Sequence, residues 1–413
     1  MKIPHFAFAV IVCLLVGWMG SQSQILFPQK ISGAINLDSL TMHVRILSGD
    51  TTFQMDGDTL RIANRTDTTY RTLARRYIVS KLQSYGLQVT IDTLVFNQGY
   101  TTGANVIATQ SGGTEPAVAV IIGAHYDARR SGGASPGADD DASGCAAVLE
   151  TARLLSGVVT DRTIVYAFWD LQNWGRLGSY RHASQIAARG DSVFGVVDVE
   201  MIGWDGNDNH VGEVHVRNYG HSEELGDSLL ALSQRASTGA TLVLYDPGLT
   251  NGDHLSFWEK GITALLLCEE VQGGDQNPFW HTENDLIEHF NFSTFQGLAT
   301  LATESVVSMS HSSDPLLVRN LSPEFPGECR LLQNFPNPFN PITTIRYGLP
   351  HRSHVLLTIF NTIGQRVAEL ENGDMDAGFH EVQFNGRNLA SGVYFYRLST
   401  GSFVDTKRLI LLK

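Results

Sequence analysis

The stretch Val118-Ala-Val-Ile-Ile-Gly-Ala-His-Tyr-Asp127 is followed, after a short loop, by Gly137-Ala-Asp-Asp-Asp-Ala-Ser-Gly144. The apolar run in the first stretch predicts a buried strand, and His125 and Asp127 stand on alternate positions at its C-terminal end, so both side chains leave on one face. The second stretch leads into an apolar, Ala-rich segment, Ala142 to Leu155, which predicts a helix. Open α/β sheets bind their ligands beyond the C-terminal ends of the strands. The two stretches therefore predict an α/β fold with a site at this edge of the sheet.

The acidic cluster in the second stretch has two interpretations. Asp140 and Asp141 stand where carboxylates cap a helix and interact favourably with its dipole. A histidine at a strand end together with an aspartate is also half of a zinc site, because zinc is bound by imidazole nitrogen and carboxylate oxygen. Taken singly, Asp140 fits capping better and His125 fits either role. Their combination favours a metal site.

The composition is that of ordinary globular protein and argues against a polyanion partner. The chain has 413 residues, enough for two or three domains, of which 43% are hydrophobic and 17% charged. Its formal net charge is -13, whereas binding to a nucleic-acid backbone needs a basic face. We therefore expect no nucleic-acid partner.

The N-terminus has the pattern of a secretory signal peptide. Lys2 precedes an apolar run from Phe6 to Met19, and small and polar residues follow, ending at Gln24. We expect a signal peptide over residues 1–24, and Cys13 lies inside its apolar run, which does not fit a lipoprotein anchor. No later segment reaches the roughly 20 apolar residues that a membrane helix needs. The pattern predicts an exported protein without a membrane span, either secreted or held at the cell surface.

Three cysteines remain after removal of the signal peptide: Cys145, Cys268 and Cys329. An odd number does not make a disulfide framework. Cys145 at a helix start and Cys268 in an apolar strand are expected to be small core residues, with a disulfide between them as the lesser alternative.

Predicted strands and helices alternate over most of the chain. An amphipathic helix from Tyr70 to Tyr85 stops at Gly86. The pattern then predicts strands at 87–95, 104–109, 118–123, 163–169, 193–202, 213–217, 242–245 and 263–269, and helices at 142–155, from 179, at 223–236 and at 292–309. This order predicts a three-layer α/β/α sandwich with a mixed, mostly parallel sheet over residues 25–311.

The rest of the chain has a different pattern. Residues 312–328, rich in Ser, Pro and acidic residues, predict a linker. Residues 329–413 contain only short strand-like runs separated by regular turns, which predicts a small C-terminal β-sandwich.

Four further segments carry polar residues where predicted strands end or loops begin, and each could complete a zinc site. They are Phe168 to Ser179, Asp198 to Gly203, Gly252 to Trp258 and Trp280 to Asp285. Catalytic zinc sites combine nitrogen and oxygen ligands and keep one position open for water.

Six of these motifs, in order and spacing, resemble those of the zinc exopeptidases related to bacterial leucyl aminopeptidase, the twenty-eighth metallopeptidase family, whose relatives include glutaminyl-peptide cyclotransferases. The resemblance covers roughly Leu40 to Ser310. Its motifs are His125-Tyr-Asp127, Gly137-Ala-Asp-Asp-Asp-Ala-Ser-Gly144, Gly175-Arg-Leu-Gly-Ser179, Glu200-Met-Ile-Gly203, Asp253-His254 and His281-Thr282.

The resemblance implies two adjacent zinc ions in one α/β/α domain. His125 would bind one zinc, His281 the other, and Asp140 would bridge both, while Glu200 stands where the family usually has aspartate. Asp127 would hold the His125 ring and fix its tautomer. A further pair, Asp253 and His254, resembles the family's substrate-side loop, with a structural role as the open alternative.

The chain departs from the family pattern after the third strand, where adjacent glutamates are replaced by Gln172 and Asn173. In the family the first glutamate is the general base and the second binds zinc. An amide cannot accept a proton at ordinary pH, and the Asn173 carbonyl is a weak ligand, so we expect one zinc or none in place of two. Asp170 could replace the base only if the strand's pleat continues through the turn to Gln172.

The C-terminal segment resembles the sorting domain of type IX secretion cargo over its full length. The resemblance rests on Leu332-Gln-Asn-Phe-Pro-Asn-Pro-Phe-Asn-Pro341, on Ala390-Ser-Gly-Val-Tyr-Phe-Tyr-Arg-Leu398 and on Lys407-Arg-Leu-Ile-Leu-Leu-Lys413. It implies the type IX machinery as a partner. The alternative is an adhesive or sugar-binding β-sandwich.

Two hypotheses about activity follow. The first is a secreted zinc aminopeptidase that removes N-terminal residues from extracellular peptides. The second is a catalytically impaired relative that binds peptide or a single zinc without turnover, because Gln172 and Asn173 replace the two glutamates. A cyclotransferase is the weaker possibility, since it too needs those glutamates.

Overall fold

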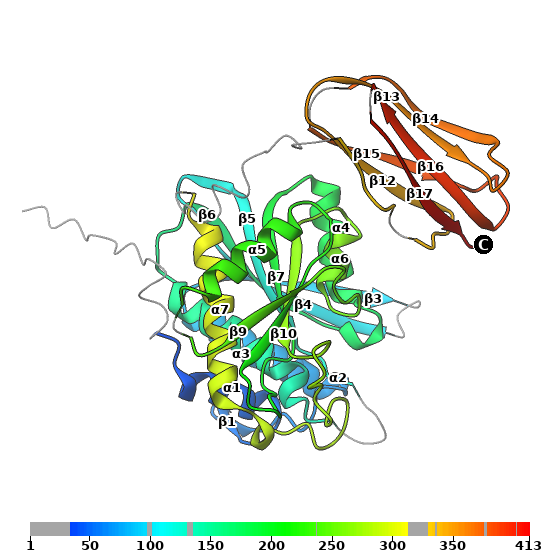
Figure 1. Ribbon diagram of the computed structural model, residues 1–413. Helices are drawn as coiled ribbons and strands as arrows, with labels where there is room; N and C mark the ends of the chain where they lie inside the picture. Colours follow the sequence, from blue (N-terminus) through cyan, green and yellow to red (C-terminus); the bar gives the residue numbers. More distant parts are fainter. Residues whose placement is uncertain are drawn as a thin grey trace, which may run out of the picture.

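The computed structural model describes residues 34–96, 101–129, 135–236, 238–312, 329–334, 337–375, 378–401 and 403–413. The signal peptide predicted for residues 1–24 lies outside the described residues, as does all of the predicted linker except Ser312. Figure 1 shows an α/β domain and a separate all-β domain.

An eight-stranded mixed sheet forms the middle layer of the α/β domain, in the order β3-β4-β6-β5-β7-β10-β8-β9. The central strands β6, β5, β7 and β10 are mutually parallel, while β4 and β8 run antiparallel to their inner neighbours. The strands are β3 (Gln88–Phe96), β4 (Thr101–Gln110), β5 (Glu115–His125), β6 (Arg162–Trp169), β7 (Ser192–Val199), β8 (Val211–His215), β9 (Thr241–Tyr245) and β10 (Ala264–Glu269).

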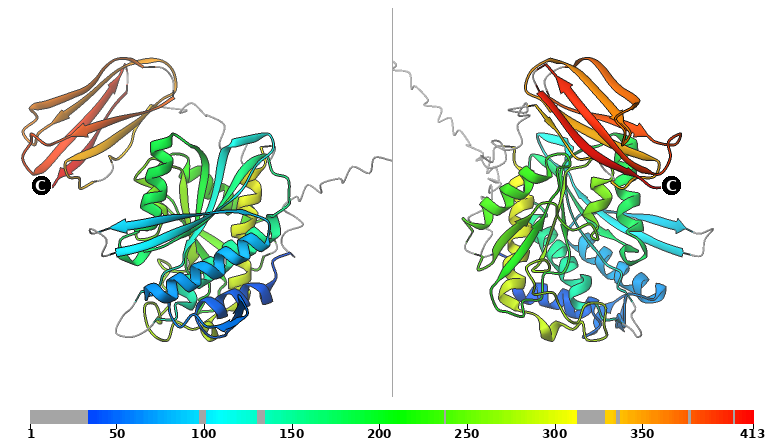
Figure 2. Two further views of the ribbon diagram at one scale, coloured as in Figure 1. Left: turned by 180° about the vertical axis from the view of Figure 1, so that it is seen from behind. Right: turned by 45° about the vertical axis from the view of Figure 1, so that its right-hand side comes forward.

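Helices cover both faces of this sheet, which confirms the predicted three-layer architecture (Figures 1 and 2). One face carries α1 (Leu37–Leu47), α2 (Thr68–Ser84), α3 (Gly144–Leu155), α5 (Ser222–Ser233) and α7 (Phe292–Ser310), and the other carries α4 (Leu177–Arg189) and α6 (His254–Trp258). The alternation of β5 divides the core: Val120 and Ile122 pack on the first face, and Ile121 packs on the second.

The elements differ from the predicted ones mainly at their ends and at the N-terminal edge. Helix α1 and the hairpin of β1 (Phe53–Met55) and β2 (Asp58–Leu60) were not predicted. The strand predicted to reach Ile202 ends at Val199, because the chain turns at Met201, whose φ is 51°. This turn places Glu200 in a loop at the C-terminal edge of the sheet.

The C-terminal domain is a small β-sandwich, as predicted. Its sheets have the orders β11-β12-β15 and β14-β13-β16-β17, and their inner faces share one apolar core that includes Tyr347 and Tyr396. The strands are β11 (Arg330–Leu331), β12 (Ile342–Leu349), β13 (Ser353–Phe360), β14 (Arg366–Met375), β15 (Gly378–Asn385), β16 (Gly392–Thr400) and β17 (Phe403–Leu411).

The expectation for the cysteines agrees with the described residues. Cys145 and Cys268 are buried free thiols, as is usual for small core residues, and Cys329 is also free. Among the described residues, no helix is both long enough and apolar enough to cross a bilayer.

Candidate metal centre

His125 ends β5 and points its Nε2 atom at the acidic cluster. Its Nε2 lies 3.1 Å from Asp140 Oδ1, and its Nδ1 lies 3.1 Å from the main-chain oxygen of Asp127 and 3.7 Å from the Asp127 carboxylate. A carbonyl can only accept, so Nδ1 donates to Asp127, and Nε2 is the ring atom that faces Asp140. Asp127 therefore does orient the ring, but mainly through its backbone.

The acidic cluster divides the two predicted roles between neighbouring residues. Asp141 accepts hydrogen bonds from the main-chain N–H groups of Gly144 (3.0 Å), His125 (3.1 Å) and Met201 (3.2 Å), which makes it the capping residue of α3. Asp140 has non-helical backbone angles and turns its carboxylate toward the histidines instead. The capping interpretation holds for Asp141, and the ligand interpretation fits Asp140.

Asp140 stands between the two histidines. Its Oδ1 faces His125, and its Oδ2 lies 2.9 Å from Nε2 of His281, a residue held at a φ of 60°. Burial alone raises the pKa of Asp140, but hydrogen bonds with both imidazoles outweigh it and lower that pKa below its usual range. An ionised carboxylate with one oxygen toward each imidazole is the arrangement that a bridging ligand needs.

Asp285 holds the backbone of Asp139 and Asp140 in place, a role that the sequence did not predict. Its two carboxylate oxygens accept the main-chain N–H groups of Asp139 (2.8 Å) and Asp140 (3.1 Å). Burial and the nearby Asp139 charge raise the pKa of Asp285 to about 8. Asp285 stands four residues after His281, at the end of the segment Trp280 to Asp285, and this position could have indicated its role.

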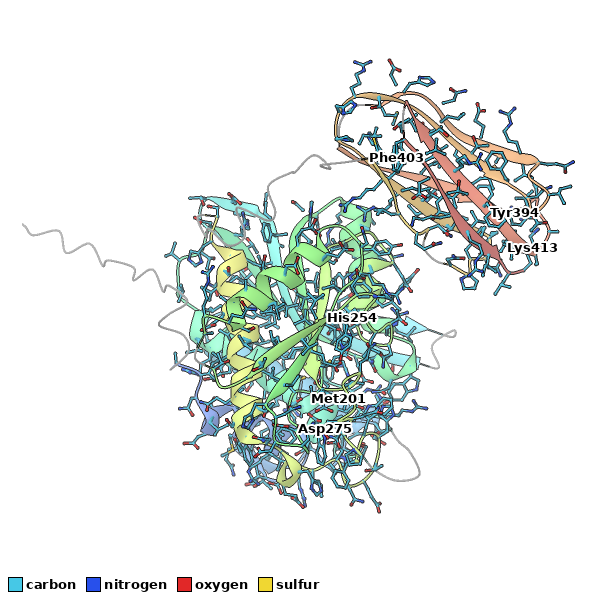
Figure 3. The ribbon with its side chains drawn as sticks, viewed as in Figure 1. Met201, His254, Asp275, Tyr394, Phe403 and Lys413 are labelled. Carbon is cyan, nitrogen blue, oxygen red and sulfur yellow. The ribbon has the colours of Figure 1, made fainter. Side chains whose placement is uncertain are left out.

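Glu200 lies close to the centre but is turned toward the loop before α6. Its Oε1 accepts the main-chain N–H of Asp253 at 2.8 Å. One oxygen each of Glu200, Asp198 and Asp253 lie within 4.8 Å of one another. Figure 3 labels Met201 and His254, the residues that follow Glu200 and Asp253 in the chain.

Gln172 and Asn173 lie in a short 3-10 turn (Gln172–Trp174) whose backbone is held by Asp127. The main-chain N–H of Gln172 donates to Asp127 Oδ1 at 2.9 Å, and that of Asn173 donates to Oδ2 at 3.1 Å. The Asn173 side-chain amide also donates to Asp127 Oδ2, at 3.3 Å, and the Gln172 amide donates to the Asn251 carbonyl at 3.1 Å. Both amides are thus engaged as donors, whereas the general base and the metal ligand that the resemblance implies must act as acceptors.

Asp170 does not continue the pleat of β6 into Gln172. The strand's pleat breaks after it, because Leu171 adopts a φ of 63° and the 3-10 turn begins at once. The Asp170 carboxylate contacts Arg71 Nε (3.1 Å), the Tyr126 hydroxyl (2.9 Å) and the main-chain N–H of Ala104 (3.0 Å). Its side chain is buried in this polar network.

Asp253 and His254 are both fully buried. Asp253 Oδ1 accepts from the Ser179 hydroxyl, and the ring of His254 contacts Asp198 Oδ2 (3.1 Å) and the Leu249 carbonyl (3.0 Å). Of the two roles that the sequence left open, these contacts favour the structural one. The pair fixes the loop that lies against Glu200.

Comparison with known proteins agrees with this geometry. Residues 105–306 match the model described as peptidase family M28. Over these residues, about half of the chain, the α/β domain is similar to this family. Residues 333–412 match the model of a secretion system C-terminal sorting domain.

Curated M28-like relatives match part of the chain. Aminopeptidase YwaD of Bacillus subtilis is 29% identical over 202 residues, which cover 45% of this chain and 40% of that protein. The leupeptin-inactivating enzyme 1 of Streptomyces exfoliatus is 33% identical over 130 residues, 31% of this chain and 28% of that protein. The chain thus spans about half or less of the length of these relatives.

Solved structures with the same fold include the LapA aminopeptidase of Legionella pneumophila, with a TM-score of 0.56 and 20% identity, covering 69% of this chain and 75% of that one. A glutaminyl cyclase of Bacteroides thetaiotaomicron has a TM-score of 0.53 and 20% identity, covering 66% of this chain and 98% of that one. At such identities these likenesses establish the M28 fold alone.

Proposed function

We propose that this M28 protein is an exported, aminopeptidase-like zinc protein that binds the N-terminal ends of peptides and hydrolyses them slowly or not at all. The proposal rests on the turn at Gln172 and Asn173. Asp127 accepts the main-chain N–H groups of both residues, and both side chains are neutral amides where the family pattern has glutamates. The metal framework beside this turn retains His125, Asp140 and His281.

The donor set fits one zinc ion better than two. His125 and Asp140 offer a nitrogen and a carboxylate oxygen, and the resemblance assigns Glu200 as a further ligand. For the second zinc, the resemblance assigns Asn173 beside His281 and Asp140, but the Asn173 amide donates to Asp127. A neutral amide is a poor zinc ligand, so this second position is the weaker one.

A zinc ion bound at this centre would polarise the scissile carbonyl and lower the pKa of a bound water. The chain's own task is then to remove a proton from that water. Gln172 cannot accept a proton, and Asp170 is committed to Arg71 and Tyr126. Loss of a positioned general base costs about 10² to 10⁴-fold in rate. Peptide binding is compatible with this centre, while rapid turnover is not.

The second candidate is a working aminopeptidase, and it is favoured by the intact bridge of His125, Asp140 and His281. Cyclotransferase activity is the weaker possibility because it depends on the same missing glutamate. Export through a signal peptide and delivery by the type IX machinery, to the cell surface or the medium, belong to both candidates and rest on the sorting domain at residues 333–412.

The deciding experiment measures hydrolysis of a panel of aminoacyl-anilides by the mature chain with added zinc, beside a variant with Gln172→Glu and Asn173→Glu. We expect little turnover by the natural chain and a gain of about 10²-fold or more in the variant. The single Asn173→Gln variant, which stays neutral, is the matched control. Ready turnover by the natural chain would establish the working aminopeptidase and refute impairment.

A further inference from the structure

A cavity of about 190 Å³ lies between α2 and the strands β3 and β4. Helix α2 packs along both strands (Figure 2). The cavity is lined by residues of these three elements and by Asp170, which directly follows β6. None of the predicted zinc ligands lines it. The cavity is therefore a separate place in the fold where a ligand can bind.

Arg71 of α2 is buried in the wall of this cavity, and its guanidinium group is fixed. Nη1 donates to the Thr66 carbonyl at 2.7 Å, and Nη2 donates to the Thr102 carbonyl at 3.0 Å. Nε lies 3.1 Å from Asp170 Oδ1 but makes no hydrogen bond with the described residues. A buried N–H group without a partner is costly, so it points to an acceptor supplied by a ligand.

Arg75 brings a second positive charge to the cavity. It stands four residues after Arg71 on the same face of α2, and it has a side-chain hydrogen bond with Tyr126. Asp170 pairs with Arg71, and no carboxylate of the described residues pairs with Arg75. Burial raises the pKa of Asp170 to about 6, so this carboxylate is ionised at neutral pH. Two arginines and one carboxylate leave an excess of positive charge, which favours an anion.

The remaining lining combines hydroxyl groups with an apolar wall. Thr72 of α2 and Thr93 of β3 supply hydroxyls, which can donate to an anionic oxygen. Ile91 of β3 also lines the cavity and is 50% exposed, so its side chain can pack against an alkyl group. Inorganic phosphate has no apolar part and carries more than one negative charge at neutral pH. The lining therefore suits a short organic anion with a single charge better.

We propose that this cavity binds a small carboxylate, either a free short-chain acid or the acidic side chain of a peptide. Guanidinium groups match carboxylates in charge and in the geometry of their N–H donors. The carboxylate accepts hydrogen bonds at Arg75 and at Nε of Arg71, and its alkyl part packs against Ile91. The peptide source rests on the proposed function, whereas the free acid does not.

The cavity adjoins the turn at Gln172–Trp174, which stands beside the metal centre. The ring of Trp174 lies over the guanidinium group of Arg71, with 5.3 Å between the ring centre and Cζ. Asp170, in the lining, precedes this turn by two residues. A carboxylate bound at Arg71 and Arg75 is therefore next to the segment where the two amides replace the glutamates.

The test uses the whole mature chain and butyrate as the probe. Metal is first removed with phenanthroline, a chelator without a carboxylate, so that butyrate cannot bind zinc. Titration followed by ligand-observed NMR should show saturable binding of butyrate. Butyramide, which has nearly the same shape but no charge, should bind at least about tenfold more weakly.

A pair of arginine variants locates the binding. Arg75→Gln should weaken butyrate binding by at least about tenfold, because it removes the charged donor. Arg76→Gln is the matched control, since Arg76 is the next residue in α2 but is exposed and pairs with Asp56 outside the cavity. Its loss should leave butyrate binding within about twofold.

Thr93→Glu provides a second variant at an exposed position of β3. Its own carboxylate should occupy the cavity and abolish butyrate binding, while near-ultraviolet circular dichroism stays that of the natural chain. This variant decides the question if Arg75→Gln fails to fold. The proposal is overturned if the natural chain binds no butyrate, if butyramide binds as tightly, or if folded Arg75→Gln or Thr93→Glu binds butyrate as the natural chain does.

Competition distinguishes the two sources of the carboxylate. N-acetyl-glutamic acid α-amide should displace butyrate if the cavity takes acidic side chains of peptides, and failure to displace it assigns the cavity to free acids. Hydrolysis of aminoacyl-anilides is not measured in this test. Absence of butyrate binding would therefore refute the carboxylate site and leave the proposed function unchanged.

Discussion

Asp140 Oδ2 lies 2.9 Å from Nε2 of His281, and this contact joins the start of α3 to a loop that comes after the last strand of the sheet. His125 occupies the other oxygen of the same carboxylate. The centre therefore has one aspartate with two imidazoles, which is a complete framework for bridging. The centre lacks the two glutamates of the family pattern, and Gln172 and Asn173 occupy their positions.

The substitution Asn173→Glu should restore the second zinc position. A glutamate offers a charged oxygen in place of an amide that donates to Asp127, so we expect zinc content to rise from one ion per chain toward two. Metal analysis after dialysis against buffered zinc measures the change. Asn173→Gln should stay at one ion, and equal content in all three proteins would contradict the assignment of this position.

Replacing Asp127 should loosen both the turn and the histidine. Asp127→Ala removes the acceptors of the Gln172 and Asn173 main-chain N–H groups, which are partly buried, and an unsatisfied buried group costs about 1–3 kcal/mol. We expect the free energy of unfolding to fall by about 2–4 kcal/mol. Chemical denaturation measures this loss. Asp127→Asn, which keeps one acceptor oxygen, should lose less, and a smaller loss in the alanine variant than in the asparagine variant would refute this role.

We expect substitution of Asp170 to lower stability without changing the pH dependence of catalysis. In the doubly substituted chain with Gln172→Glu and Asn173→Glu, adding Asp170→Asn should leave the pH profile of kcat unchanged in shape while lowering the melting temperature, because its pair with Arg71 is buried. Steady-state kinetics from pH 5 to 9 with a thermal scan check both parts. Loss of the acidic limb of the profile would instead make Asp170 the base.

Glu304 should make the fold less stable as pH rises. Burial raises the pKa of this glutamate in α7 from 4.5 to about 7, and its Oε2 has no hydrogen-bond partner among the described residues. The folded chain then binds more protons than the unfolded chain between these values, so stability falls as pH increases from about 4.5 to 7. Glu304→Gln should remove this loss and be more stable by about 1–3 kcal/mol at pH 8.

Denaturation of both proteins at pH 4.5 and pH 8 measures the difference. The gain from Glu304→Gln should be small at the lower pH, where the glutamate is already protonated in the folded chain. A gain of equal size at both values would show that the cost is one of packing rather than of charge. Glu259→Gln, at a partly exposed position, should show no such pH dependence.

Much of this molecule follows from local sequence. The alternation along β5, the run of apolar residues in α3 and the stop of α2 at Gly86 are dictated by side-chain period and by backbone freedom, so the three-layer fold was predictable. The motifs also placed His125, Asp140 and His281 as one centre, and the structure brings them together. The amides at Gln172 and Asn173 are visible in the sequence alone.

Only the tertiary structure decided how neighbouring acids divide their roles. Asp140 and Asp141 are adjacent and chemically identical, and which one caps the helix depends on the main-chain N–H groups of His125, at the end of β5, and Met201, in the loop after β7. The same is true of Asp198 and Asp253, whose meeting requires the loop after β7 to lie against α6. Burial and distance are properties of the packed chain, and they determine which carboxylate caps a helix, which faces the histidines and which oxygens remain without a partner.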